Sequence, residues 1–186
     1  MKHWHEEMPF TLNDSLTEQI FTEKSLFFDI ETTGFSAART SLYLIGCAAR
    51  KKNLLIVDQF FAETPADESD VLHAFLDYLK NFDTIITFNG IGFDIPYLTN
   101  KCQKYKISAP FSSYEYVDIY KMISGFRFLF ALPDLKQKTV EQFIGLNRQD
   151  MYNGGELIKI YQSYCQLKDA DALSLLLLHN LDDLKG

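Results

Sequence analysis

The chain has 186 residues, of which 47% are hydrophobic, and its 18 basic and 25 acidic side chains give a net charge of −7. A chain of this length and hydrophobicity can bury a substantial core in one domain, which excludes intrinsic disorder. The negative charge excludes a protein that coats DNA through a general phosphate-binding surface.

The chain has three cysteines, at positions 47, 102 and 165. Their odd number and scattered spacing argue against disulfides and zinc ligation, so we expect core thiols in a reducing compartment. The N-terminus lacks the apolar segment of a signal peptide, and no later run is long enough to span a membrane. We therefore expect a soluble, cytoplasmic protein without membrane contact.

The first 24 residues contain Pro9 and a cluster of small polar residues without sustained periodicity. They predict an extended N-terminal arm (residues 1–24) that packs on a single domain (residues 25–186).

After the arm, the apolar run 26–28 predicts a buried strand that leads into Asp29 and Glu31. Side chains alternate along a strand, so both acids must project from one face. Adjacent carboxylates repel unless a cation neutralises them, which suggests half of a divalent metal site. The alternative is that one acid caps a turn and the other is solvated.

Two further apolar strands are predicted over residues 41–50 and 53–61, joined by a short hairpin, and together with the acidic strand they predict an antiparallel meander. A helix is predicted from Thr64 to about Asn81, because a hydroxyl cap, a first-turn proline and helical apolar spacing occur in succession. Residues 84–88 then read as a buried strand, which implies a crossover to a parallel neighbour. The expected fold class is α/β, with a mixed sheet flanked by helices.

Asp94 follows this strand, in the sequence 89–96 (NGIGFDIP), and a helix is predicted from Ile95 to about Tyr105. The acid could simply cap that helix, since Pro96 is typical company for an N-cap. Alternatively, the glycines at 90 and 92 allow a ligand to approach the backbone at the end of the strand, where open α/β sheets bind ligands.

The segment 111–131 mixes aromatic with basic residues, which could stack nucleic-acid bases, although core packing is the favoured use. Asp134 and Gln137 form a capping-box pattern that predicts a helix ending at Gly145. Two more helices are predicted, over 156–166 and 169–185. In the last one, His179 and Asp183 are four residues apart and therefore share a face. A surface ion pair is the alternative to a functional role for these two residues.

The order of these motifs resembles the DEDD superfamily of 3′-to-5′ exonucleases on a ribonuclease-H-like fold, and most closely its YprB-type ribonuclease-H-like exonuclease family. The resemblance extends from Phe27 to the end of the chain. It is carried by residues 29–34 (DIETTG), 44–46 (LIG), 88–96 (FNGIGFDIP), 135–141 (LKQKTVE) and 179–183 (HNLDD), with Gly145, Arg148 and Gly154.

The resemblance implies that Asp29, Glu31, Asp94 and Asp183 bind two Mg²⁺ or Mn²⁺ ions and that His179 is the general base. Asp29 would bridge the ions, Glu31 and Asp183 would complete one shell, and Asp94 would help to hold the other. In the commonest histidine-bearing subclass the histidine precedes the last aspartate by five residues. Here the interval is four, as in the tyrosine-bearing subclass, which leaves the role of His179 open.

The implied activity is hydrolysis of single-stranded DNA or RNA from its 3′ end, with release of 5′-mononucleotides. Thr32, Thr33, Phe35 and Asn89 are candidates to hold the terminal nucleotide, with simple turn structure as the alternative. Two other functions fit the same pattern: a ribonuclease-H-type endonuclease, and a catalytically silent nucleic-acid-binding module. The sequence does not distinguish DNA from RNA, and an additional domain or partner protein is compatible with it.

Overall fold

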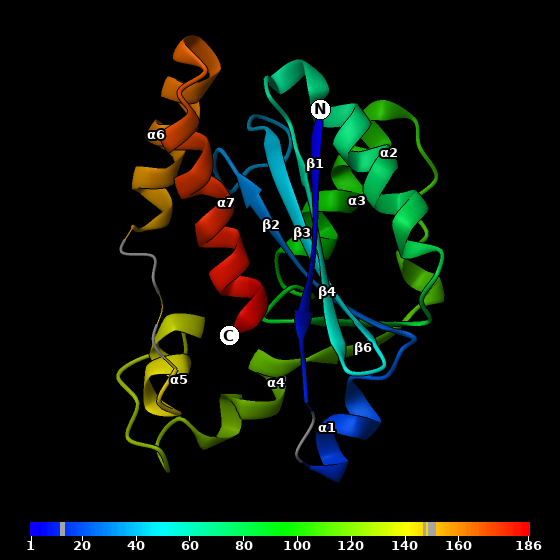
Figure 1. Cartoon of the computed structure of the whole chain (residues 1–186), viewed down its shortest axis with the longest axis vertical. Coiled ribbons are helices and arrows are strands. Elements are labelled where there is room, and N and C mark those ends of the chain that lie inside the picture. Colours follow the sequence, from blue (N-terminus) through cyan, green and yellow to red (C-terminus); the bar gives the residue numbers. More distant parts are fainter. Residues whose placement is uncertain (12–13, 147, 149–151) are drawn as a thin grey trace.

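The computed structural model describes residues 1–11, 14–146, 148 and 152–186. A six-stranded sheet forms its centre, with the strand order β1-β4-β3-β2-β5-β6 (Figure 1). Its strands are β1 (Lys2–Pro9), β2 (Ser25–Thr32), β3 (Leu42–Lys51), β4 (Leu54–Phe61), β5 (Thr84–Thr87) and β6 (Glu115–Asp118). The helices are α1 (Ser15–Ile20), α2 (Glu68–Leu79), α3 (Asp94–Tyr105), α4 (Ile119–Ile123), α5 (Gln137–Phe143), α6 (Gly154–Leu167) and α7 (Ala170–Lys185).

The sheet is mixed, as the sequence predicts. Strands β2, β3 and β4 form the expected antiparallel meander, and β5 returns through α2 to pair parallel with β2. Strand β6, which the sequence analysis does not predict, adds parallel to β5. Within the predicted N-terminal arm, β1 pairs antiparallel with β4 and forms one edge of the sheet.

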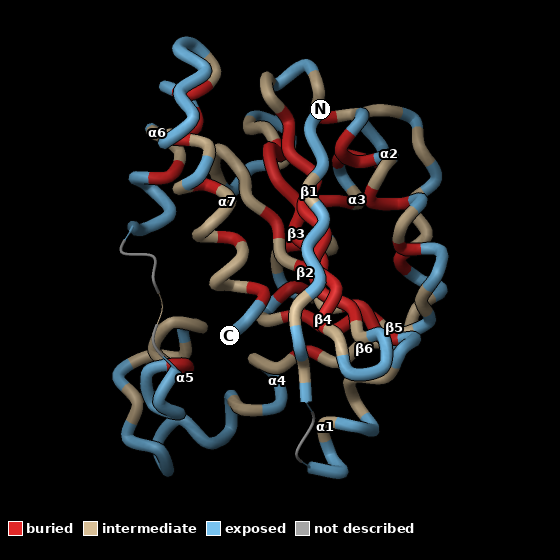
Figure 2. The backbone as a smooth tube through the Cα atoms, in the orientation of Figure 1, coloured by how far each residue is buried: buried red, intermediate tan, exposed pale blue. Residues whose placement is uncertain are grey.

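Helices cover both faces of the sheet, and this explains why the central strand β3 is buried from Leu42 to Ala49 (Figure 2). On one face, the ring of Phe28 in β2 packs 4.9 Å from that of Phe75 in α2. On the other face, Asp29 contacts Asn180 of α7, and α6 packs against α7. The alternation of side chains along β2 therefore separates a hydrophobic face from a face that carries acids.

Two sequence predictions need correction. The expected core packing of the aromatic residues of 111–131 is confirmed only in the first part of the segment, where Phe111 is buried and Tyr114 and Tyr116 pack against the core. In the second part, Phe126, Phe128 and Phe130 are 50%, 91% and 37% exposed. These three follow the short helix α4, and the ring centroid of Phe130 lies 6.0 Å from that of Phe126 and 5.3 Å from that of Phe143 in α5. The predicted capping box at Asp134 is also absent: α5 begins at Gln137, because Asp134 Oδ1 instead accepts the backbone N–H of Lys136 in the turn before it.

The three cysteines are free, and Cys47 and Cys102 are buried as expected. In the described part of the chain, none of the helices combines the length and the apolar character that crossing a membrane requires.

Candidate active site

Strand β2 continues through both acids, so Asp29 and Glu31 project from its α7 face while Ile30 between them is buried. The pairing with β3 is regular up to Glu31 and shifts between Glu31 and Thr32. The strand therefore holds the two carboxyl groups in a fixed relation and bends away only after the second one.

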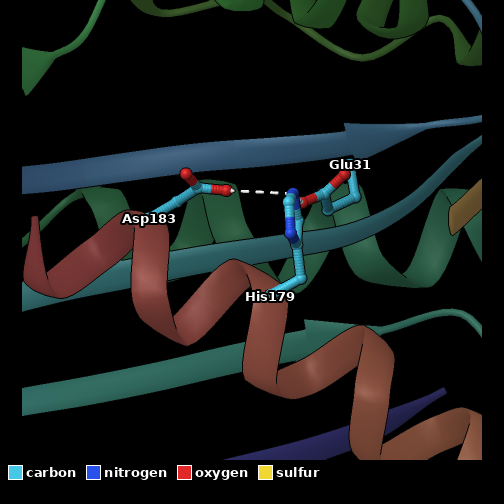
Figure 3. Close-up of side chains that lie close together, drawn as sticks. All are labelled: Glu31, His179 and Asp183. Atoms are coloured by element: carbon cyan, nitrogen blue, oxygen red, sulfur yellow. Dashed lines mark ion pairs between the residues drawn. The ribbon is translucent and has the colours of Figure 1, made fainter. Parts of the chain in front are cut away.

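Helix α7 brings His179 and Asp183 to the same place. The His179 Nε2 atom lies 3.3 Å from Asp183 Oδ2 and 3.5 Å from Glu31 Oε1 (Figure 3). The side chains of His179 and Asp183 are only 14% and 13% exposed, so they do not form a solvated surface ion pair. One ligand atom from each of Glu31, His179 and Asp183 lies within 4.8 Å of the others.

Asp94 is the first residue of α3 and is 6% exposed. The N-cap of α3 is Phe93, and no side chain caps the helix there, so Asp94 does not serve the capping role that its sequence context allows. Burial raises the pKa of Asp94 to about 7, although hydrogen bonds from its own backbone N–H and that of Ile30 oppose this shift. The contact with Ile30 brings Asp94 beside the acids of β2.

We refer to Asp29, Glu31, Asp94 and Asp183 as the acid cluster. Burial, followed by the charges of the other three acids, raises the pKa of Asp29 well above its usual value. Burial also raises the pKa of Glu31 to about 8, and it raises the pKa of Asp183 against the opposing effect of His179 and Arg148. Four mutually repelling carboxyl groups thus share one enclosed region, and they can all ionise only if positive charge enters it.

The carboxylate oxygens of this cluster fit a hard divalent ion such as Mg²⁺ or Mn²⁺, which prefers oxygen ligands. The fit rests on the buried and mutually repelling acids, and on the spacing of Glu31, His179 and Asp183. These acids are the residues that could hold such ions.

Sequence reasoning missed the residues that support Asp29. Asn180 is fully buried and donates from Nδ2 to Asp29 Oδ2 at 3.3 Å, and its own Oδ1 accepts from Gln59 Nε2 at 2.9 Å. Gly46 of β3 leaves the space for this side chain, because a Cβ there would lie 2.0 Å from Asn180 Oδ1. A glycine within an apolar strand is the signal that could have revealed this close approach.

A second missed support is Arg148, which the sequence offers only as a motif match. Its Nη2 lies 2.6 Å from Asp183 Oδ1, and its guanidinium also pairs with the buried Glu141 of α5. Gln137, at the start of α5, donates from Nε2 to the Asp183 carbonyl at 2.7 Å. These contacts attach α5 to the end of α7.

The candidate substrate residues lie around the same region with different local roles. Thr32 Oγ1 donates to the Gly34 carbonyl at 3.0 Å, and Thr33 Oγ1 accepts the Ser41 backbone N–H at 2.8 Å, so both hydroxyls take part in turn structure. Phe35 is 91% exposed, and its ring centroid lies 5.9 Å from that of Phe93 in an edge-to-face arrangement. Asn89 is exposed and has a positive φ of 63° at the end of β5.

Comparison with known proteins gives three findings. A family model described as RNase_H superfamily matches residues 26–185. A DNA polymerase of Pyrococcus glycovorans is 34% identical over an alignment of 96 residues, and the match covers 47% of this chain and 12% of the polymerase. The solved structure of the family B DNA polymerase from the hyperthermophilic archaeon Pyrobaculum calidifontis superimposes with a TM-score of 0.68 at 20% identity, covering 87% of this chain and 23% of that one. This chain therefore corresponds to only a minor part of either polymerase.

Proposed function

The chain belongs to the RNase_H superfamily, and from this premise we propose that it is a metal-dependent 3′-to-5′ exonuclease that shortens single-stranded DNA or RNA and releases 5′-mononucleotides. Superfamily membership and the similarity to DNA polymerases support nuclease activity. The 3′-to-5′ direction, the two-ion mechanism and the closer kinship with the YprB-type family rest on the sequence motifs.

The observation that carries the proposal is that buried acids from β2, α3 and α7 lie close enough to repel one another, and that two of them, Glu31 and Asp183, also contact His179. A phosphodiester resists hydrolysis because its negative charge repels nucleophiles, and a pocket of bare carboxylates would repel it further. Two divalent ions held by the acid cluster would supply the positive charge that stabilises the attacked phosphate and the leaving oxygen.

The chain's own residues then have distinct roles in this proposal. The acid cluster holds the ions, and Asn180 orients the carboxylate of Asp29. His179 accepts the proton of the attacking water, a role supported by its ring lying within 3.5 Å of both Glu31 and Asp183. Phe35 presents an exposed ring against which the terminal base can stack.

The test is incubation of 5′-labelled single-stranded DNA and RNA with the protein in Mg²⁺, Mn²⁺ or EDTA. We expect a ladder of shortened products with either metal and none in EDTA. Asp29→Asn should abolish the ladder while the far-UV circular dichroism spectrum stays unchanged. Asp70→Asn is the matched control, because Asp70 is an exposed acid on α2, and it should cleave like the wild type.

Circular single-stranded DNA separates the proposal from an endonuclease. An exonuclease leaves the circle intact, whereas opening of the circle would contradict the requirement for a free end. If the wild type and Asp29→Asn were equally inert on every linear substrate, the chain would instead be a silent nucleic-acid-binding module.

A further inference from the structure

A cavity of about 430 Å³ lies beside the acid cluster, and it is lined by Asn89 but by none of the other residues expected to hold the terminal nucleotide. Its lining residues are Phe88, Asn89, Tyr120, Leu135, Lys136 and Gln137. They come from the ends of β5 and β6 and from the start of α5, at the carboxyl edge of the parallel strands, where α/β sheets bind ligands. Gln137 connects this cavity to the site, because its Nε2 donates to the carbonyl of Asp183.

The walls of the cavity are held in place by a buried carboxylate, Asp118, which is 5% exposed. Its Oδ1 accepts the backbone N–H groups of Asn89 at 3.1 Å and Lys121 at 3.2 Å, and its Oδ2 accepts that of Ile91 at 3.1 Å. One side chain thus fastens the loop after β5 to the start of α4, which carries Tyr120. The part of the wall that carries Asn89 and Tyr120 is therefore preformed, so little conformational entropy of these segments would be lost on binding.

The lining combines the chemical groups that recognise a nucleotide. The rings of Phe88 and Tyr120 lie 6.2 Å apart in an edge-to-face arrangement, which leaves aromatic surface for a base. The Lys136 side chain is 81% exposed, and its ammonium lies 3.7 Å from Asp134, a distance at which it can still meet a phosphate. Asn89 and Gln137 supply amide groups for the edge of a base or a sugar.

The charge of the surrounding segment also favours a polyanion. Residues 119–146 contain four basic and two acidic residues, in a chain whose net charge is −7. This local positive excess would attract a phosphate backbone that most of the protein surface repels.

We propose that this cavity binds the nucleotide on the 5′ side of the scissile phosphate, an inference that rests on the proposed exonuclease function. A second cavity, of about 290 Å³, is bordered by Phe35, Gly92 and Phe93, where the terminal nucleotide is expected. The loop after β5 contributes residues to both cavities, and Asp94 follows it as the first residue of α3. A strand that crosses the acid cluster would therefore place one nucleotide in each cavity.

Binding can be measured as the fluorescence anisotropy of 5′-fluorescein-labelled dT8 in Ca²⁺. Tyr120→Ala and Lys136→Ala should each weaken binding about tenfold, the loss typical of one stacked base or one phosphate contact. Tyr120→Phe and Lys136→Arg should bind like the wild type, because they keep the ring and the charge. Lys136→Ala should also reduce the slope of log affinity against log salt by about 0.7, whereas Tyr120→Ala should not change this slope.

Kinetics test the position of the cavity along the strand. The wild type should hydrolyse the trinucleotide pTpTpT with a higher kcat/KM than the p-nitrophenyl ester of thymidine 5′-monophosphate, which has no upstream nucleotide. In Tyr120→Ala and Lys136→Ala the ratio of the two kcat/KM values should fall about tenfold. Lys51→Ala, at the exposed end of β3, is the matched control and should keep the wild-type ratio.

These measurements distinguish failure of the proposed exonuclease function from failure of the cavity assignment. If the wild type hydrolyses neither substrate, the proposed function fails. The assignment of the cavity is overturned if the wild type hydrolyses both substrates while Tyr120→Ala and Lys136→Ala have the wild-type dT8 affinity and the wild-type kcat/KM ratio. In that case the proposed exonuclease activity is still supported. Circular dichroism melting of Tyr120→Ala distinguishes lost binding from lost folding, and Lys136→Ala changes a solvated side chain that the fold does not need.

Discussion

Replacing Gly46 with alanine tests whether the contact between β3 and α7 supports Asp29. The new Cβ would lie 2.0 Å from Asn180 Oδ1 and 2.9 Å from its Nδ2. Asn180 is fully buried, so its amide cannot turn into solvent. Either the side chain gives up its hydrogen bonds to Gln59 and Asp29, or α7 moves away from the sheet.

The expected loss in the free energy of unfolding follows from these two options. Overpacking a close-packed contact costs about 1–3 kcal/mol, and each lost buried hydrogen bond costs about 1 kcal/mol more. We therefore expect Gly46→Ala to lower the free energy of unfolding by about 3 kcal/mol. Because the Asn180–Asp29 hydrogen bond is lost in either case, nuclease activity should fall as well.

Urea denaturation followed by circular dichroism measures the effect, with two comparisons. Gly125→Ala is the matched control, because among the described residues no atom beyond its chain neighbours lies within 4 Å of the added Cβ, and it should change stability by less than about 1 kcal/mol. In an Asn180→Ala background the obstacle is gone, so Gly46→Ala should then cost less than about 1 kcal/mol. The reasoning is refuted if Gly46→Ala is as mild as Gly125→Ala, or if its cost is the same in both backgrounds.

Three further predictions concern the buried charges. The acid cluster has raised pKa values in the fold, so between about pH 5 and 8 the metal-free native state binds more protons than the unfolded chain. In EDTA the free energy of unfolding should therefore fall as pH rises, by about 1.4 kcal/mol per pH unit for each extra proton bound by the native state. Mg²⁺ should make this dependence on pH weaker. Urea midpoints that rise with pH in EDTA would contradict the prediction. Arg148→Met removes the cation that pairs with Asp183, so the free energy of unfolding in EDTA should fall by about 3 kcal/mol. Mg²⁺ should restore part of this loss. An unchanged free energy of unfolding in EDTA would show that the ion pair is dispensable. Lys101 is fully buried against Glu68, so Lys101→Met should lower the free energy of unfolding, measured by urea titration, by about 3 kcal/mol. Lys80→Met, at an exposed ion pair, should lower it by less than about 1 kcal/mol. Equal losses in the two variants would contradict a stabilising role of the buried pair.

Local periodicity is sufficient to predict the elements of the fold that carry the acids. The alternation along β2 predicts that Asp29 and Glu31 share a face, and the helical spacing of His179 and Asp183 predicts theirs. Both patterns follow from the geometry of a single strand or helix, so the face on which these side chains lie does not depend on how the rest of the chain packs.

The supports of the site depend instead on contacts between distant segments. Asn180 reaches Gly46 only because α7 crosses β3 at that residue, and Arg148 reaches Asp183 only because α5 docks beside the end of α7. No short-range pattern encodes these crossings. The exposure of Phe128 has a similar origin, since composition cannot reveal which residues of the segment after α4 other segments cover.

The acids of the site come from segments that are far apart in the order of synthesis. Three of them lie in β2 and α3, whereas the fourth lies in α7, more than 80 residues later. A nascent chain from which only β1 to β6 have left the ribosome would still lack Asp183 and His179. The acid cluster can therefore be completed only after α7 has left the ribosome and docked on the sheet.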